Sequence, residues 1–465
     1  MTMDQSRRAF LKRASMLSMA GGAAPFVMNL AAMGEAAAAT ASDYKALVCV
    51  FLFGGNDHAN TLVPYDSTQY GVYRTQRAGL ALAQSALDPT VLRPSIPLAS
   101  GAQYALAPSL AKLLPIFDAG KMAVMLNVGT LVQPTTKAQY NARSVPLPPK
   151  LLSHNDQQNY WQASGPEGAT SGWGGRIGDL LQSGNGTSTL TCINLAGNAV
   201  FLTGKAAVQY SITSSGPIGL TARTSLNGSA AASTLLQSLI GGSVAGNHQF
   251  GSALGTIGSR ALGLYTQVTG ALAQAPTIAT PFPAAADPSS SLGAQLQAVA
   301  RLIAVSQQLG AKRQVFFVST GRYDTHDGLG TLHPTLMTNL GDALRAFYDT
   351  TVELGVANQV TTFTASDFGR ALTANNDGSD HGWGSMHFVL GGAVKGGRYY
   401  GINPTIANGG PDDIGQGRLI PTMSVDQYAA TLASWFGVAA SDLATVVPNI
   451  GNFAGSALGT NVGFV

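Results

Sequence analysis

Short runs of apolar residues recur along the chain and predict β-strands. Most of the runs are almost continuously apolar, as expected for strands that are covered on both faces of a sheet. They span residues 46–53, 121–128, 189–196, 315–319, 360–366 and 386–393. Helical spacing appears between the runs 315–319 and 360–366, where Leu336, Leu340, Leu344 and Phe347 follow one another at steps of four, four and three. Strands that alternate with helices predict an α/β fold with a mostly parallel central sheet flanked by helices.

A further helix is predicted near the carboxyl end. Ser424 and Gln427 form a capping-box pattern, and Gly437 is a natural stop after the last turn. One face of this helix would be lined by Tyr428, Leu432 and Phe436.

Residues 205–300 differ from the rest in being rich in Gly, Ser, Ala and Thr. We expect 228–275 to be a helical insertion or cap and the Pro-rich stretch 275–291 to be a linker. Residues 42–465 would then form a single α/β domain that carries this insertion.

The amino terminus has the features of an export signal. Arg7 and Arg8 precede an uncharged, modestly apolar stretch, 14–34, and small residues then fit an A-x-A cleavage site. This order predicts that residues 1–41 are a twin-arginine (Tat) signal, which makes the Tat translocase a partner during export. The mature protein would be periplasmic or extracellular.

A membrane-spanning helix is the alternative interpretation of the same stretch. It is too weakly apolar for a convincing span, since it contains Gly21, Gly22, Pro25 and Asn29. No comparable apolar run follows, so we expect no stable membrane span after cleavage.

The composition limits which kinds of partner and which cysteine chemistry we expect. Charged residues make up 11% of the chain and the formal net charge is +3, which gives no indication of a nucleic-acid partner. Two cysteines, Cys49 and Cys192, are too few for a disulfide framework or a cysteine metal site. Each lies in an apolar run, so we expect buried thiols, with a single bridge between them as the alternative.

Acidic and histidine residues gather where predicted strands end. Because ligands of open α/β sheets bind at the carboxyl ends of the strands, these positions predict one shared site. They are Asp57, His58, Asp324, His326, Asp367, Arg370, Asp380 and His381.

A separate segment offers Ser153, His154 and Asp156 at a predicted helix N-terminus. Free N–H groups and the helix dipole at such a terminus favour an alkoxide and an incoming anion. Asp and His are ligands for divalent metals, and an arginine such as Arg370 can clamp a transferring anionic group. Taken singly, each Asp or Ser is as well explained as a helix N-cap.

Together these segments resemble a bacterial family known as domain of unknown function 1501, whose members commonly carry Tat signals. The resemblance covers about residues 45–402. The motifs that carry it are Gly54-Gly55-Asn56-Asp57, Ser153-His154-Asn155-Asp156-Gln157, Asp324-Thr325-His326, Ser366-Asp367-Phe368-Gly369-Arg370 and Ser379-Asp380-His381-Gly382.

That family resembles the alkaline phosphatase and sulfatase superfamily, which implies two metals at the strand ends. By this resemblance, Asp57 and Asp367 would hold the first metal, and Ser153 would be the nucleophile. The second metal would be held by Asp324, His326 and His381. The chain departs from the superfamily at Phe368, where a histidine is usual, and from the family at Asp367, where a glutamate is usual.

The sequence therefore predicts an exported, divalent-metal-dependent hydrolase for phosphate or sulfate esters, with Zn, Mn, Mg or Ca as the metal. The alternative is a non-catalytic exported protein with a degenerate metal site that serves binding or envelope assembly. The Asp-Phe-Gly at 367–369 also occurs in protein kinases, but the chain lacks the Gly-rich and His-Arg-Asp loops of a kinase.

Overall fold

The computed structural model describes residues 44–465 except 198, 220–223, 242–248 and 285–290. The predicted export signal, with Arg7 and Arg8, therefore lies outside the described residues. Within the described part, the main element is a ten-stranded sheet with the order β13-β4-β12-β9-β1-β8-β5-β6-β7 and with β14 beside β4.

The centre of the sheet is parallel. Strand β1 (Lys45–Leu52) lies between β8 (Arg313–Thr320) and β9 (Val360–Ser366) and pairs in parallel with both. Strand β5 (Cys192–Asn194) continues the parallel arrangement beyond β8. It is shorter than the predicted 189–196 because a 3-10 turn (Ser188–Leu190) takes up the first residues of that run.

One of the long strands is antiparallel to its neighbours. Strand β12 (Ser385–Gly391) runs against both β9 and β4 (Met122–Gly129). The residues between β9 and β12 form an antiparallel hairpin of β10 (Arg370–Ala374) and β11 (Ser379–His381). The hairpin returns the chain to the edge where β9 ended, so β12 has to run in the opposite direction.

Short strands complete the sheet. Strands β13 (Arg398–Tyr400) and β14 (Met423–Ser424) are parallel to β4. At the other edge, β6 (Gln209–Thr213) is parallel to β5, and β7 (Gly216–Pro217) is antiparallel to β6. The sheet is therefore mostly parallel, as predicted.

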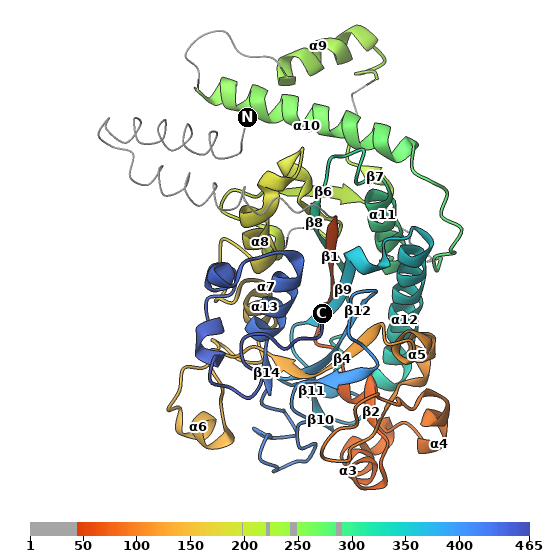
Figure 1. The fold of residues 1–465 in the computed structure, drawn as a ribbon, viewed down its shortest axis with the longest axis vertical. Helices are drawn as coiled ribbons and strands as arrows, with labels where there is room; N and C mark the ends of the chain where they lie inside the picture. Colours follow the sequence, from red (N-terminus) through yellow and green to blue (C-terminus); the bar gives the residue numbers. More distant parts are fainter. Residues whose placement is uncertain (1–43, 198, 220–223, 242–248, 285–290) are drawn as a thin grey trace, which may run out of the picture.

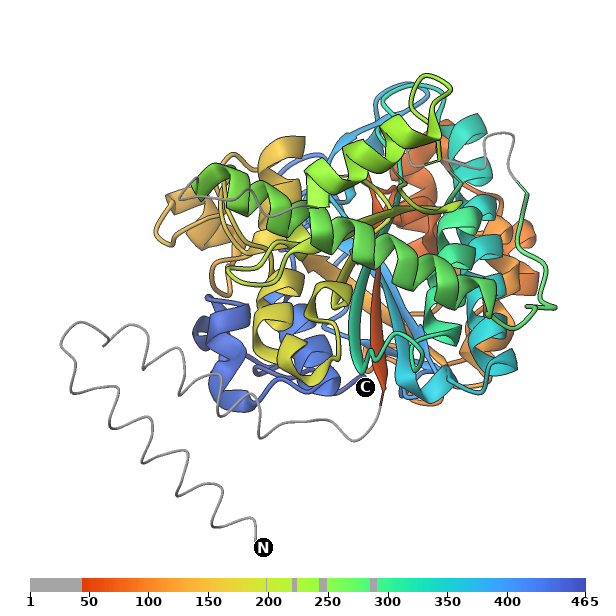
Figure 2. The ribbon, with the colours of Figure 1, turned by 90° about the horizontal axis from the view of Figure 1, so that it is seen from above.

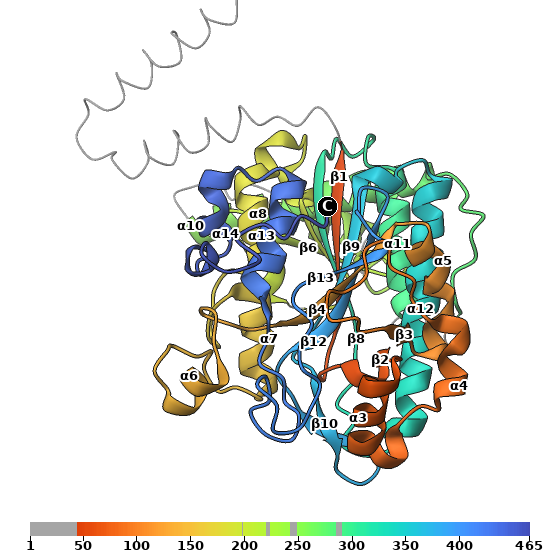
Figure 3. The same cartoon turned by 60° about the horizontal axis from the view of Figure 1, so that its bottom comes forward.

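Both faces of the sheet are covered, which explains the nearly continuous apolar runs. Alternate residues of β1 enter different cores: Val48 and Val50 on one face, Cys49 and Phe51 on the other. Figure 3 shows the two helical layers on either side of the strands. One contains α5 (Leu114–Asp118), α11 (Leu292–Ala304) and α12 (Leu329–Glu353); the other contains α7 (His154–Ala163), α8 (Trp173–Leu181), α13 (Val425–Phe436) and α14 (Leu443–Val446).

Smaller elements lie at the lower end of the molecule in Figure 1. They follow the carboxyl end of β1 or connect the later strands. They are β2 (Leu62–Pro64), α3 (Ser67–Arg77), α4 (Gln84–Leu87), β3 (Tyr104–Leu106) and α6 (Lys137–Ala142).

Two helices lie at the opposite end, where the sequence predicts helix between 228 and 275. They are α9 (Ala230–Gly241) and α10 (Gln249–Ala273). Figure 2 shows α10 crossing over the top of the molecule with α9 beside it.

The predicted helix cap and the predicted free thiols are confirmed. Helix α13 begins with a capping box in which Ser424 accepts from the Gln427 N–H, and it ends at Gly437, whose φ is +123°. Cys49 and Cys192 are free and buried. Among the described residues, none of the helices combines the length and the apolar character that crossing a membrane requires.

Asp426, in the first turn of α13, is a buried carboxyl group. One of its oxygens accepts the Asn449 N–H at 3.1 Å. Burial raises the pKa of Asp426 to about 7, although Asn449 and the positive charge of Arg176 oppose the shift. Because an exposed Asp has a pKa of about 3.9, the folded protein retains this proton over a pH range in which the unfolded chain has lost it.

We predict that the stability of the Asp426→Asn variant, relative to that of the unchanged protein, increases as pH rises. The stabilisation from protonated Asp426 is complete below about pH 4 and is lost as pH rises through about 7. Urea unfolding at acidic and at mildly alkaline pH should show an advantage of the variant that grows by roughly 1–4 kcal/mol between the two. The partly exposed Asp342→Asn is the matched control, and an advantage independent of pH would contradict the prediction.

Candidate metal centre

Loops from several elements meet at the carboxyl ends of β8 and β9. Asp324 and His326 lie in the loop after β8, and Asp367 directly follows β9. His381 is the last residue of β11, and His154 is the first residue of α7. The structure thus brings together four of the five predicted metal ligands, and it adds His154.

Asp324 lies at the centre of this cluster. Its Oδ1 is 3.1 Å from His326 Nε2 and 3.2 Å from His381 Nε2, and its Oδ2 is 3.4 Å from His154 Nε2. The Nε2 atoms of His326 and His381 are 2.9 Å apart. His154, Asp324 and His381 each offer a ligand atom, and these atoms lie within 4.8 Å of one another. Three imidazoles therefore point the same nitrogen at one carboxylate.

The other nitrogen of each imidazole faces an acceptor. His154 Nδ1 donates to Asp367 Oδ2 at 2.6 Å, and His381 Nδ1 donates to the Leu152 carbonyl at 2.7 Å. His326 Nδ1 lies 3.5 Å from Asp380 Oδ1. A proton held on Nδ1 leaves the Nε2 lone pair free, which is how the histidine ligands of metals are oriented.

Asp367 holds His154 in place by hydrogen bonding. Its buried carboxylate accepts from His154, from Gln158 Nε2 at 2.8 Å and from the Gly54 N–H at 3.2 Å. The sequence indicates Asp367 as a metal ligand, but here it orients the ligand His154. The side chains placed to hold a metal are therefore His154, Asp324 and His381, with His326 Nε2 lying 2.9 Å from His381 Nε2.

A constrained loop aims the Leu152 carbonyl at His381. Lys150 and Leu152 both have positive φ, +42° and +73°. Non-glycine residues adopt this region rarely and at a cost, and they concentrate at functional sites. Here the conformation fixes the tautomer of His381.

Arg370 neutralises the central carboxylate. Its buried guanidinium donates to Asp324 Oδ1 at 2.8 Å, to the Gly54 carbonyl at 3.2 Å and to the Ser379 carbonyl. Partial burial would raise the pKa of Asp324, but the hydrogen bond and charge of Arg370 outweigh it and lower that pKa. The sequence predicts an anion clamp at this position; the structure instead commits Arg370 to holding Asp324.

The histidines respond to the same surroundings. The hydrogen bond to Asp367 raises the pKa of His154. Desolvation lowers the pKa of His381, assisted by the nearby His154 and Arg370. Desolvation therefore favours the neutral imidazole of His381, which is the form able to ligate a metal.

Asp57 and His58 lie outside the cluster. The buried Asp57 carboxylate pairs with the buried guanidinium of Arg77 at the end of α3. Arg77 also donates to the Ala371 carbonyl at 3.1 Å. Burial lowers the pKa of His58 to about 4, and its Nδ1 accepts the Arg370 N–H at 3.4 Å. Neither residue is placed as a ligand of the Asp324 cluster.

Ser153 lies between two residues that contact the cluster, Leu152 and His154. Its hydroxyl donates to Asp156 Oδ2 at 2.8 Å, and Lys150 Nζ is 3.7 Å from the other carboxylate oxygen. Although Ser153 is the N-cap residue of α7, its side chain makes no capping hydrogen bond. The hydroxyl therefore has an adjacent base instead of the expected structural partner.

Phe368 fills the space beside the histidines. Its ring centroid is 4.9 Å from that of His154 and 4.6 Å from that of His381. A Cβ on Gly55, which has φ +83°, would lie 2.4 Å from the Phe368 ring. Both the backbone conformation and the ring thus require glycine at position 55.

Two residues of the network are missed by the sequence analysis. Gln158 was detectable, because it lies one turn after His154 and therefore on the same helix face. Arg77 had no local signal, since it meets Asp57 only through the tertiary fold.

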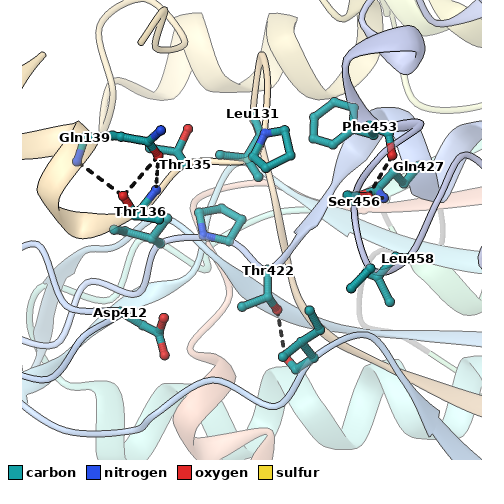
Figure 4. Close-up of a pocket in the computed structure, with 15 residues that line it drawn as sticks. Leu131, Thr135, Thr136, Gln139, Asp412, Thr422, Gln427, Phe453, Ser456 and Leu458 are labelled. Atoms are coloured by element: carbon teal, nitrogen blue, oxygen red, sulfur yellow. Dashed lines mark hydrogen bonds between the residues drawn. The ribbon is translucent and has the colours of Figure 1, made fainter. Parts of the chain in front are cut away.

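Defined cavities lie elsewhere in the molecule. Figure 4 shows one of about 420 Å³, where Leu131, Phe453 and Leu458 face polar side chains that include Thr136, Asp412 and Thr422. Another, of about 320 Å³, is lined by Asn60, Leu80, His333 and neighbours. Neither is lined by a residue of the Asp324 cluster, which occupies a partly exposed position.

The fold and the cluster define a mixed α/β protein with a candidate His/Asp metal centre. The family model described as Protein of unknown function (DUF1501) matches residues 44–423, and the chain belongs to this family. The family predicted from the motifs is thereby confirmed. No curated protein matches the chain.

Solved structures show only distant similarity. Ps i-CgsB in complex with k-i-k-neocarrahexaose has 8% identity and a TM-score of 0.35, with 86% of this chain and 74% of that chain covered. The lipoteichoic acid synthase LtaP from Listeria monocytogenes has 8% identity and a TM-score of 0.32, with 88% and 79% covered. Similarities of this size assign no function to the chain.

We predict that Asp57→Ala impairs folding stability and leaves metal binding intact. Removing one partner of a buried ion pair leaves an uncompensated charge, which costs about 3–5 kcal/mol. Urea unfolding measures the loss, and titration with Zn²⁺ measures the binding. Adding Arg77→Met should recover part of the stability. Unchanged stability with lost metal would instead identify Asp57 as a ligand.

Proposed function

We propose that this protein is an exported, divalent-metal-dependent hydrolase that acts on phosphate or sulfate esters. The observation that carries the proposal is the convergence of three Nε2 atoms on the Asp324 carboxylate. The resemblance of the family motifs to alkaline phosphatases and sulfatases supports the choice of ester. Export by the Tat translocase, to the periplasm or beyond the cell, rests on Arg7 and Arg8 and the stretch that follows them.

The donor set fits a transition metal such as zinc or manganese. Zinc bonds to nitrogen and oxygen of about 2.0–2.2 Å at tetrahedral angles separate neighbouring donors by about 3.3 Å. The three distances from the Asp324 carboxylate to the imidazole Nε2 atoms are 3.1, 3.2 and 3.4 Å, and the ligand atoms of His154, Asp324 and His381 all lie within 4.8 Å of one another. Histidine nitrogens with Nδ1 hydrogen-bonded also suit zinc better than calcium or magnesium, which prefer oxygen.

A bound divalent metal would polarise the phosphoryl or sulfuryl oxygen of the ester. The residues of the chain would supply the rest of the chemistry. Asp367 and the Leu152 carbonyl hold the two imidazoles in their binding tautomers, and Arg370 fixes the central carboxylate. These contacts are formed before substrate arrives, so no reorganisation is needed during the reaction.

Ser153 is the candidate nucleophile. Its proton already points at Asp156 Oδ2, so the carboxylate can accept this proton as the serine oxygen bonds to the phosphorus or sulfur and the bond to the ester's alcohol oxygen breaks. The departing alcohol takes up a proton, and water then hydrolyses the esterified serine. Ser153 lies between Leu152 and His154 in the chain, so the backbone connects it directly to two residues that contact the cluster.

A non-catalytic metal-binding protein is the second candidate, and the packing of Phe368 favours it. The ring occupies the side of His154 and His381 where the superfamily usually places another histidine. Such a protein would keep the metal for binding or envelope assembly and would turn over no ester.

We predict that the purified protein binds one equivalent of Zn²⁺ or Mn²⁺ and hydrolyses aryl phosphates, diesters or aryl sulfates. Asp324→Ala should weaken metal binding by more than about a hundredfold, because it removes the carboxylate that all three histidines share. Metal content by mass spectrometry and calorimetric titration measure the first effect, and a chromogenic ester panel measures the second. Asp342→Asn, remote on α12, is the matched carboxylate control.

The outcomes separate the two candidates. Metal bound with no turnover of any ester supports the non-catalytic protein. Absence of metal binding under all conditions rejects both candidates.

We further predict that Ser153→Ala lowers kcat by about a thousandfold or more while metal affinity stays within about twofold of the unchanged protein. Ser214→Ala, on a serine outside the cluster, controls for loss of a hydroxyl. A variant that retains full activity would show that Ser153 is not the nucleophile.

A further inference from the structure

Large exposed apolar side chains concentrate on one projecting part of the molecule. Five lie on α9 and α10, the pair at the top of Figure 1 and crossing Figure 2. They are Leu235 (60% exposed), Leu239 (65%), Phe250 (85%), Leu254 (60%) and Ile257 (63%). We refer to these five side chains as the α9–α10 patch.

The patch continues an apolar stripe that is buried further along the same helix. Apolar residues of α10 recur at alternating steps of four and three: Phe250, Leu254, Ile257, Ala261, Leu264, Val268 and Ala271. Such a heptad spacing keeps one seam of a helix facing a packing partner. Leu264, Val268 and Ala271 are buried in the core beside the sheet. The amino-terminal half of the seam, from Phe250 to Ile257, has no such cover within the described part of the chain.

Helix α9 covers a different side of α10. A Cβ on Gly258 would lie 2.2 Å from the Ile240 carbonyl oxygen, so the two helices are in close contact there. Leu235 and Leu239 lie one helical turn apart and remain exposed despite this contact. The two helices thus pack against each other near Gly258, and each also carries large apolar side chains that remain exposed.

The composition of α10 indicates that its first turns depend on packing. Gly251, Gly255 and Gly258 all lie in the projecting half, and each makes the helix less stable than alanine would. Helices in proteins obtain most of their stability from burial of an apolar face. The first turns of α10 are therefore expected to be more stable when another surface covers their apolar face.

Charge restricts the kind of partner. Arg260 is the only charged residue in the sequences of α9 and α10. Helices that adsorb to anionic lipid surfaces are rich in Lys and Arg on their polar face, and this pair is not. A charged partner protein would also find no complement. The partner that fits is apolar, uncharged and helical.

We propose that the α9–α10 patch is a docking surface for a second copy of this chain. The α9–α10 pairs of two copies would pack against each other about a two-fold axis and form a four-helix bundle. The seam of this bundle would continue the buried stripe of α10. A second copy offers the same spacing and the same lack of charge, so nothing in the patch repels it.

The size of the patch sets the strength of the association. Five such side chains expose an apolar area of the order of 500 Å², comparable with the largest patch on a typical monomer. Two patches together reach about 1,000 Å², the lower limit for a specific protein interface. The dimer is therefore weak and depends on concentration.

Sedimentation equilibrium of the full chain over a wide concentration range tests the proposal. The unchanged protein should shift from monomer to dimer as its concentration rises. Phe250→Glu and Leu254→Glu should each weaken the dimer by about a hundredfold or more, because each places a charge in the apolar seam. Ser252→Glu, on the opposite side of the same helix, is the matched control and should leave the association unchanged.

Two further measurements test whether the variants keep their fold and their candidate metal centre. Circular dichroism shows whether each variant retains its helices, and metal binding at the Asp324 cluster should be the same in all of them. A protein that stays monomeric at every concentration overturns the proposal. So does a monomer that binds neutral phosphatidylcholine vesicles and loses this binding on Phe250→Glu, since the patch would then face lipid.

Discussion

The parallel pairing of β1 with β8 and β9 is the constraint on which the candidate centre depends. Leu52 stands opposite Thr320 on one side and Ser366 on the other, so the three strands end at the same level. The loops that follow β8 and β9 therefore begin two strand spacings apart, about 10 Å. This places Asp324 and Asp367 in one region, although they are 43 positions apart in the sequence. Both faces of the sheet are packed with helices, which leaves this edge as the place where polar side chains can gather.

The different burial of Asp324 and Asp367 determines which of the two carboxylates is available to contact a metal. Asp367 is fully enclosed and accepts three hydrogen bonds, so it has little capacity left for an ion. Asp324 remains almost half exposed and receives only one charged donor, Arg370. The inner carboxylate therefore orients a ligand, and the outer carboxylate is the group around which the imidazoles assemble. This division of roles follows the usual relation between the ligands of a metal and the residues that hold those ligands.

The sequence predicts the positions of the site better than the roles of its residues. Nearly continuous apolar runs identify buried strands, and Asp or His directly after such runs must lie at the sheet edge. Roles depend on tertiary geometry that no local pattern carries. The turn that gives Leu152 a φ of +73° directs its carbonyl to His381, and the fold alone brings Arg77 to Asp57. The antiparallel direction of β12 likewise follows from the β10–β11 hairpin, which the apolar runs do not indicate.

The buried ion pair of Asp57 with Arg77 favours a site with one metal, whereas the superfamily resemblance implies two metals. A cation beside Asp57 would have to displace a buried guanidinium that also donates to the Ala371 carbonyl. Breaking such a pair leaves Arg77 charged and unpaired in a dry environment, a cost of about 3–5 kcal/mol that metal binding would have to exceed. Phe368 adds a second obstacle, because its ring fills the space next to His154 and His381. Arg77 and Phe368 thus occupy the positions around the first metal. Asp324 is also paired with an arginine, Arg370, but unlike Asp57 it is partly exposed and has imidazole nitrogens beside it. A hydrolase built on this plan would rely on a single ion, with Ser153 and Asp156 supplying the nucleophile and its base.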